Sequence, residues 1–248
     1  MNKWKEIWNK RDSETDTLDN IKNDIERTVL ELKRLDGWDS TSEKIEFDAF
    51  KAQFDELKNE LSWNGKLGES VNIESVFEVG CGAGPSLYMF EKFIPEIKYT
   101  GGLDYSGVLI EQAAHVLDKP AELYEAEAKD MKVDRKYNCI FANSVFSYFN
   151  SLDYAESVLN KMIQKTEYSI GILDLHDISK KEEFLQKRRE LTPNYDERYK
   201  NLDKLFYPKD FFMDFADKNE LDIKFVHSDM KGYWNNPFLF NVFMYKRS

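Results

Sequence analysis

The stretch with the greatest capacity for chemistry runs Val76-Phe77-Glu78-Val79-Gly80-Cys81-Gly82-Ala83-Gly84-Pro85. An apolar run contains an acid, glycine then stands at every second position, and a proline follows that suits the first turn of a helix. Glycine permits positive φ and lets a ligand approach the backbone, while a helix start offers free N–H groups. The stretch therefore predicts a buried strand, a tight turn and a helix that together form a ligand-binding corner.

The spacing of this corner restricts the ligand. A dinucleotide fingerprint, G-x-G-x-x-G, fails because Pro85 occupies the place of the third glycine. A P-loop fails because no lysine followed by serine or threonine closes the glycine run. What remains is E-x-G-x-G-x-G, in which the carboxylate of Glu78 repels a pyrophosphate and attracts an ammonium group.

A second acid, Asp104, follows Gly101-Gly102-Leu103 at the end of another expected strand. A carboxylate at this place can accept hydrogen bonds from both hydroxyls of a ribose, as in dinucleotide sites. The alternative is that Asp104 caps the helix that begins near Ser106, and both roles can hold together.

A third polar group, Leu173-Asp174-Leu175-His176-Asp177, ends a later strand. Histidine suits a general base because its ordinary pKa lies near neutrality, and Asp174 is in a position to orient the ring of His176. Two alternatives stay open: a solvated loop histidine, and a metal site made by Asp174, His176 and Asp177.

The hydrophobic pattern indicates the elements that position these groups. Residues 1–70 read as a polar helical segment, and residues 71–248 as strands alternating with helices, interrupted by a charged, aromatic, lid-like insertion at 176–207. The last two strands have no helix between them and should pair antiparallel. The expected fold is α/β, with a mostly parallel sheet of strands at 75–80, 97–103, 121–126, 137–142, 167–174, 221–227 and 237–246.

Composition excludes several classes of function. The 248 residues carry a formal net charge of −11, which argues against a nucleic-acid partner. Two cysteines, Cys81 and Cys139, fall in expected buried elements, so a reducing compartment and no disulfide are expected. Neither a signal-peptide core nor a run of transmembrane length is visible, and we expect a cytoplasmic protein with no membrane partner.

The glycine corner, with Gly101-Gly102-Leu103-Asp104-Tyr105-Ser106, resembles motifs I and II of the class I S-adenosylmethionine-dependent methyltransferases over residues 70–246. The resemblance implies a seven-stranded Rossmann-like sheet with a C-terminal antiparallel hairpin, and S-adenosylmethionine as the cofactor. It assigns Asp104 to the ribose, Tyr105 to the flank of the adenosine, and Glu127 with Ala128 to the adenine, with Asp130 as the alternative. The methionine end falls to Glu78, Gly80, Cys81, Gly82, Asn143 and Ser144.

Other residues suit the acceptor of a methyl group. Tyr148 is placed to enter an acceptor pocket, with a core tyrosine as the alternative, and Arg188 and Arg189 suit an anionic acceptor that needs no base. Aromatic and amide side chains that suit a polar acceptor are found at Tyr207, Tyr233 and Asn235. Trp4, Trp8 and Arg11 either close over the cofactor or only pack on the domain.

Three further stretches, 143–149, 205–207 and 238–242, look like a bacterial methyltransferase subgroup associated with cell-surface polysaccharides and small metabolites. This resemblance implies O-methylation of a small polar acceptor: a sugar, a nucleotide-linked sugar or a phosphate-containing precursor. The alternatives are an N-methyltransferase, a nicotinamide-dependent oxidoreductase and a non-catalytic cofactor-binding module. The oligomeric state does not follow from the sequence.

Overall fold

The computed structural model describes residues 3–11, 15–38, 44–63 and 70–247. These residues contain one sheet whose strands follow the order β3-β2-β1-β4-β5-β7-β6. The parallel pairing of β1 with β2 and β4, and the antiparallel pairing of β7 with β5 and β6, confirm the predicted sheet. The strands are β1 (Ser75–Val79), β2 (Tyr99–Asp104), β3 (Pro120–Glu125), β4 (Tyr137–Asn143), β5 (Thr166–His176), β6 (Leu221–His227) and β7 (Leu239–Lys246).

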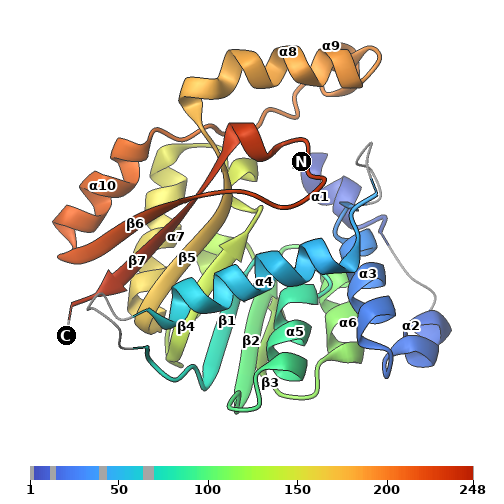
Figure 1. Cartoon of the computed structure of the whole chain (residues 1–248), viewed down its shortest axis with the longest axis vertical. Coiled ribbons are helices and arrows are strands. Elements are labelled where there is room, and N and C mark those ends of the chain that lie inside the picture. Colours follow the sequence, from blue (N-terminus) through green and yellow to red (C-terminus); the bar gives the residue numbers. More distant parts are fainter. Residues whose placement is uncertain (1–2, 12–14, 39–43, 64–69, 248) are drawn as a thin grey trace.

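Helices cover both faces of this sheet (Figure 1). Successive side chains of a strand point to opposite faces, so Val76 and Phe141 join one core while Phe77 and Ile140 join the other. The central strands are therefore buried on both sides, as parallel sheets require. One face carries α3 (Ile25–Leu35), α4 (Phe47–Ser62), α5 (Pro85–Phe93) and α6 (Gly107–Val116), and the other carries α7 (Leu152–Lys165) and α10 (Lys209–Lys218).

The N-terminal helices share the core of the sheet. Leu32 of α3 and Leu61 of α4 lie in the same apolar cluster as Val76 and Phe90. Ahead of them come α1 (Lys3–Trp8) and α2 (Thr15–Ile21). The chain turns between α2 and α3 because the Asp24 side chain accepts the N–H of Arg27 and starts a new helix. The division of the chain at residue 70 stays a prediction.

The segment between β5 and α10 forms α8 (Lys181–Leu191) and α9 (Tyr195–Arg198), which lie across one end of the sheet (Figure 1). Phe184 anchors α8 in a small apolar cluster with Phe206 and Phe238. This segment starts from the carboxyl end of β5, on the side where ligands bind in such sheets. Its movement as a lid stays a prediction.

The order of strands reverses direction at β1, whose two neighbours are β2 and β4. The carboxyl ends of these strands diverge into connections on opposite faces, which opens a crevice where α/β sheets bind ligands. Glu78, Asp104 and Asn143 lie at or near these strand ends. No helix of the described residues combines the length and apolarity needed to span a membrane.

The packing of α4 on the sheet side can be tested by Phe54→Ala. Phe54 is 4% exposed, and its ring centroid lies 4.9 Å from that of Phe90. We expect the free energy of unfolding, measured by urea denaturation, to fall by about 3–5 kcal/mol because the substitution leaves a cavity. The control, Asn59→Ala on the exposed side of α4, should change it by less than about 0.5 kcal/mol. Equal losses in the two variants would contradict this packing.

Candidate functional site

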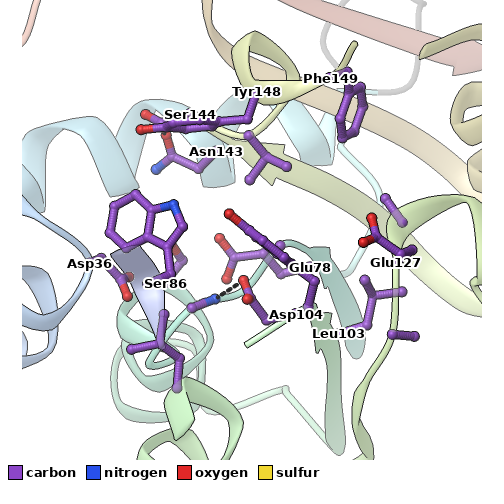
Figure 2. Close-up of a pocket in the computed structure, with 18 of the residues that line it drawn as sticks. Asp36, Glu78, Ser86, Leu103, Asp104, Glu127, Asn143, Ser144, Tyr148 and Phe149 are labelled. Atoms are coloured by element: carbon purple, nitrogen blue, oxygen red, sulfur yellow. Dashed lines mark hydrogen bonds between the residues drawn. The ribbon is translucent and has the colours of Figure 1, made fainter. Parts of the chain in front are cut away.

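A cavity lies at the carboxyl ends of β1, β2 and β4 and contains roughly 1130 Å³ of space between protein atoms, part of it open to solvent. Figure 2 shows Glu78 and Asp104 on one side, facing Asn143, Ser144 and Tyr148. Of the residues predicted from the sequence, the lining includes Glu78, Gly80, Gly82, Asp104, Tyr105, Glu127, Ala128, Asn143, Ser144 and Tyr148.

At two positions of the glycine loop, Gly80 and Gly82, the packing leaves no room for a side chain. Gly80 and Gly82 have φ of +69° and +54°, in the left-handed region. A Cβ atom on Gly80 would lie 2.4 Å from Val145 Cγ2, and one on Gly82 would lie 2.2 Å from Asp36 Oδ1. The loop therefore needs glycine for its conformation and for its contacts, and it brings backbone to the cavity wall.

The carboxylate of Asp104 links two turns at the floor of the cavity. Its Oδ2 accepts the Gly82 N–H at 3.0 Å (Figure 2), and its Oδ1 accepts the Ser106 N–H at 2.8 Å. Burial raises the pKa of Asp104 to about 6 despite these hydrogen bonds. The N-cap of α6 is Ser106, whose hydroxyl accepts the Leu109 N–H, so the capping alternative for Asp104 is wrong.

Two buried ionisable groups, the carboxyl group of Glu78 and the amine of Lys33, line the cavity and interact electrostatically. Glu78 is 3% exposed, and among the described residues its Oε2 atom has no hydrogen-bond partner. Burial raises the pKa of Glu78 well above its ordinary value and lowers that of Lys33. Lys33 is 5% exposed and interacts electrostatically with Glu78 and Asp36.

Asp36 completes the group. Its Oδ1 atom accepts the Ala83 N–H at 2.8 Å, and burial raises its pKa to about 7. Three carboxyl groups (Asp36, Glu78 and Asp104) and one ammonium group (Lys33) thus meet at the cavity. An unpaired buried charge is costly. The arrangement suits a ligand that carries both positive charge and a carboxylate.

The sequence analysis missed Lys33, Asp36 and Trp38, which line the cavity from the end of α3. A signal for the first two was present. Lys33 and Asp36 each lie four residues after an apolar residue of the α3 stripe, Val29 and Leu32, and so fall on its buried face. Charged residues on the apolar face of a helix indicate that this face contributes to a binding site as well as to the core.

Helix α1 lies beside the cavity. The indole rings of Trp4 and Trp8 meet the Tyr148 ring edge-on, with centroids 4.8 and 6.0 Å away, and Trp8 lines the cavity. An ion pair of 2.9 Å between Lys5 and Glu125 ties α1 to the end of β3. Arg11 donates to the Arg34 carbonyl at 2.9 Å. Closure of this helix over a ligand stays a prediction.

Asp174 sits at an irregularity of β5, where the register with β7 shifts. Its Oδ2 atom accepts the Ser144 hydroxyl at 2.6 Å, and its N–H donates to Asn241 Oδ1 at 2.9 Å. Ser144 and Asp174 both have positive φ, 60° and 58°, a conformation that costs energy for residues other than glycine. Because its carboxylate also accepts from Ser228, Asp174 does not orient the His176 ring as expected.

His176 is 5% exposed, which excludes a solvated loop histidine. Its ring lies 4.8 Å from that of Phe184 and 5.3 Å from that of Phe206, measured between centroids. Within the described chain its Nδ1 atom has no hydrogen-bond partner. Burial, together with the charges of Lys204 and Arg188, lowers its pKa well below the ordinary value, so the ring is neutral at pH 7.

Several predicted residues lie outside the cavity lining. Tyr207 is fully buried and donates to the Phe146 carbonyl at 2.8 Å, so its predicted contact with substrate is wrong. Arg189 is exposed and binds Asp196 at 3.0 Å, away from the cavity. Cys81 is 1% exposed, and a Cβ on Gly102 would touch its sulfur at 2.8 Å, so its side chain packs against β2.

The loop after β6 reaches the cavity indirectly. Asn235 donates to the Tyr233 hydroxyl at 3.2 Å, and the ring of Tyr233 lies 4.8 Å from that of Trp38, a lining residue.

Both cysteines are free thiols. In the described residues, no three His, Cys, Asp or Glu side chains are arranged to hold a metal ion, and the metal alternative at His176 gains no support.

Comparison with known proteins identifies similar sequences and folds. No family model matches the chain. It is 29% identical over 118 residues to malonyl-[acyl-carrier protein] O-methyltransferase of Priestia megaterium, a match that covers 47% of this chain and 41% of that protein. The chain thus aligns with about two fifths of the length of this curated relative.

Solved structures share the fold of this chain over more of its length. Magnesium protoporphyrin IX methyltransferase of Synechocystis with bound S-adenosylhomocysteine aligns with a TM-score of 0.55 at 14% identity, over 82% of this chain and 84% of its own. The plantazolicin methyltransferase BpumL, in complex with a desmethylPZN analogue and S-adenosylhomocysteine, aligns with a TM-score of 0.58 at 14% identity, over 95% of this chain and 100% of its own. The N-methyltransferase NodS of Bradyrhizobium japonicum aligns with a TM-score of 0.56 at 11% identity, over 81% of this chain and 88% of its own. The chain therefore has the fold of S-adenosylmethionine-dependent methyltransferases.

Proposed function

We propose that this protein is an S-adenosylmethionine-dependent methyltransferase that methylates an oxygen atom of a small polar acceptor. The observation that carries the proposal is the pairing of a glycine loop with two buried acids at one cavity, Glu78 without a partner for Oε2 and Asp104 held by the loop. The fold agrees, since solved structures of this fold hold S-adenosylmethionine or S-adenosylhomocysteine.

The residues present fit the cofactor. The partnerless Oε2 of Glu78 suits its ammonium group, and the buried Lys33 suits its carboxylate. Asp104 suits the ribose hydroxyls, while Glu127 and Ala128 suit the adenine. The cofactor supplies a methyl group that is already activated by its positive sulfur.

The protein's own task is to align the acceptor and to exclude water. Trp8 and Tyr148 supply apolar surface to the cavity lining. A hydroxyl acceptor has to lose a proton, and for that acceptor we assign His176, neutral at pH 7, as the base. The proposed acceptors are a sugar, a nucleotide-linked sugar or a phosphate-containing precursor.

Two other functions make different predictions. An oxidoreductase would be stabilised by NADH and not by S-adenosylhomocysteine in a thermal denaturation assay, whereas Glu78 and Pro85 argue for the reverse. A non-catalytic module would bind the cofactor without transferring its methyl group to any acceptor. A further alternative is methylation of a nitrogen atom, which the name of NodS specifies. The name of the Priestia relative favours methylation of oxygen instead.

Asp104→Asn tests the ribose assignment. The substitution keeps the shape of the side chain and removes one charged acceptor, so we expect affinity for S-adenosylhomocysteine to fall about 10- to 100-fold by calorimetry. Asp118→Asn is the control, because Asp118 is exposed and binds Lys92 at the opposite end of α5. Unchanged affinity in a folded Asp104→Asn protein would refute the assignment.

The pH dependence of binding tests the acidic cluster. The pKa values of Asp36 and Asp104, raised by burial to about 7 and about 6, mean that both acids lose charge on acidification from pH 7.5 to 5.5. A positively charged ligand favours the ionised forms, so affinity should fall over this range. The fall should be steeper for S-adenosylmethionine than for S-adenosylhomocysteine, which lacks the sulfonium charge.

Calorimetry at several pH values measures both ligands without relying on turnover. Asp36→Asn should flatten the profile near pH 7, because one of the two titrating acids is gone. Identical pH profiles for the two ligands would mean that the acids do not act on the sulfonium charge.

A further inference from the structure

Two cations lie near Tyr148. They are Arg188 of α8 and Lys204 of the segment before α10, here called the cation pair. Each interacts electrostatically with the other and with His176. Within the described residues neither forms a salt bridge, although both are at least partly buried. Two neighbouring cations without a bound acid are unfavourable in such a place.

The ammonium group of Lys204 contacts a hydroxyl and two aromatic rings. Its Nζ atom donates to the Ser147 hydroxyl at 3.2 Å and lies 3.4 Å from the ring centroid of Tyr148. The Trp4 ring centroid is 5.4 Å away. Burial, with the charge of Arg188, lowers the pKa of Lys204 to about 7, so its charge is poorly compensated.

Arg188 is held by aromatic rings. The centre of its guanidinium lies 5.1 Å from the Tyr195 ring centroid, 4.9 Å from that of Tyr199 and 5.6 Å from that of Trp234. Its Nε atom is buried and has no hydrogen-bond partner in the described chain. Ring contacts fix the plane of a guanidinium while leaving N–H groups at its edge for a planar oxyanion.

Asp174, which interacts with Lys204, has other hydrogen-bond partners of its own. Asp174 interacts electrostatically with Lys204, yet its carboxylate accepts hydroxyls from Ser144 and Ser228, and burial raises its pKa. Tyr148, which contacts Lys204, also lines the cavity. The cation pair therefore adjoins the space that an acceptor enters.

We infer that the acceptor is a carboxylic acid, bound as its carboxylate by Arg188 and Lys204 beside Tyr148, and that the product is a methyl ester. This inference rests on the proposed methyltransferase function and replaces the hydroxyl or phosphate of the proposed acceptor with a carboxylate as the group that is methylated. A carboxylate fits the pair because two oxygens in one plane match the edge of a fixed guanidinium, with the ammonium group as a second partner.

The reaction balances without a base. A lone pair of the carboxylate oxygen forms the new bond to the methyl carbon, and the carbon–sulfur bond breaks with its electrons going to sulfur. The negative charge of the acid and the positive charge of the sulfur disappear together, and no proton leaves. His176, whose neighbouring cations disfavour the protonated ring, then has no proton to accept.

Binding to the complex with S-adenosylhomocysteine tests the inference. The probes are benzoate and hexanoate, each compared with its amide, benzamide or hexanamide, and with phenyl phosphate. We expect at least one acid to bind about 10-fold or more tightly than its amide, as judged by calorimetry. Arg188→Gln should remove this preference. Lys187→Gln, which takes a positive charge from the same helix at an exposed residue paired with Glu190, should preserve it.

The other outcomes are decisive as well. Equal affinity for acid and amide in both pairs, or a preference that survives Arg188→Gln, overturns the carboxylate inference while leaving the methyltransferase proposal intact. Tighter binding of phenyl phosphate than of either acid overturns it in favour of a phosphate acceptor. Absence of S-adenosylhomocysteine binding in the first titration overturns the proposed function itself.

A second readout follows the transferred group. With S-adenosylmethionine that carries a labelled methyl group and the acid that binds, label should appear in a product that mild alkali converts to volatile methanol, as an ester requires. Arg188→Gln should lower this rate about 10-fold or more through KM. Label that resists alkali would show an ether or amine product and overturn the inference.

Discussion

The site depends on a hydrogen bond between two turns. The N–H of Gly82, in the loop after β1, donates to the carboxylate of Asp104 at the end of β2. The same carboxylate accepts the Ser106 N–H and so fixes the start of α6. Because Gly82 has no room for a Cβ, the loop reaches this acid only as glycine. One buried side chain thereby sets the relative position of the two turns that form the floor of the cavity.

Charge is arranged in two regions around that fixed point. Near the glycine loop, acids predominate, and only Lys33 among the cavity-lining residues there is basic. Near Tyr148 the two cations Arg188 and Lys204 interact with each other, and Lys204 also interacts with Asp174. Burial shifts the pKa values of Asp36, Asp104 and Lys204 toward the neutral forms, a sign that each region lacks counter-charge. A cationic cofactor and an anionic acceptor complement the two regions.

Local patterns were enough to predict the sheet and the floor of the site. The corner at Glu78 and Gly80 is specified by residues adjacent in sequence, and the strands by short apolar runs. Contacts between segments that are distant in the sequence could not be predicted from local patterns. The bond from Ala83 to Asp36 spans 47 positions, so nothing near the glycine loop indicates it. Residue type alone misplaced Tyr207 and Arg189, because an aromatic or basic side chain does not reveal whether it faces the core, the solvent or a ligand.

The contribution of α3 to the cavity has a thermodynamic consequence. Lys33 lies in α3 and Asp36 is its C-cap residue, and the apolar face of α3 is part of the main core, so the docking of this helix and the binding of ligand depend on the same segment. By reciprocity, a ligand that binds these residues stabilises the docked helix, and its apparent affinity falls in proportion to the fraction of molecules in which the helix is undocked. Substitutions on the far side of α3 that populate the undocked helix will thus weaken ligand binding, and saturation with ligand will suppress local unfolding of the N-terminal helices.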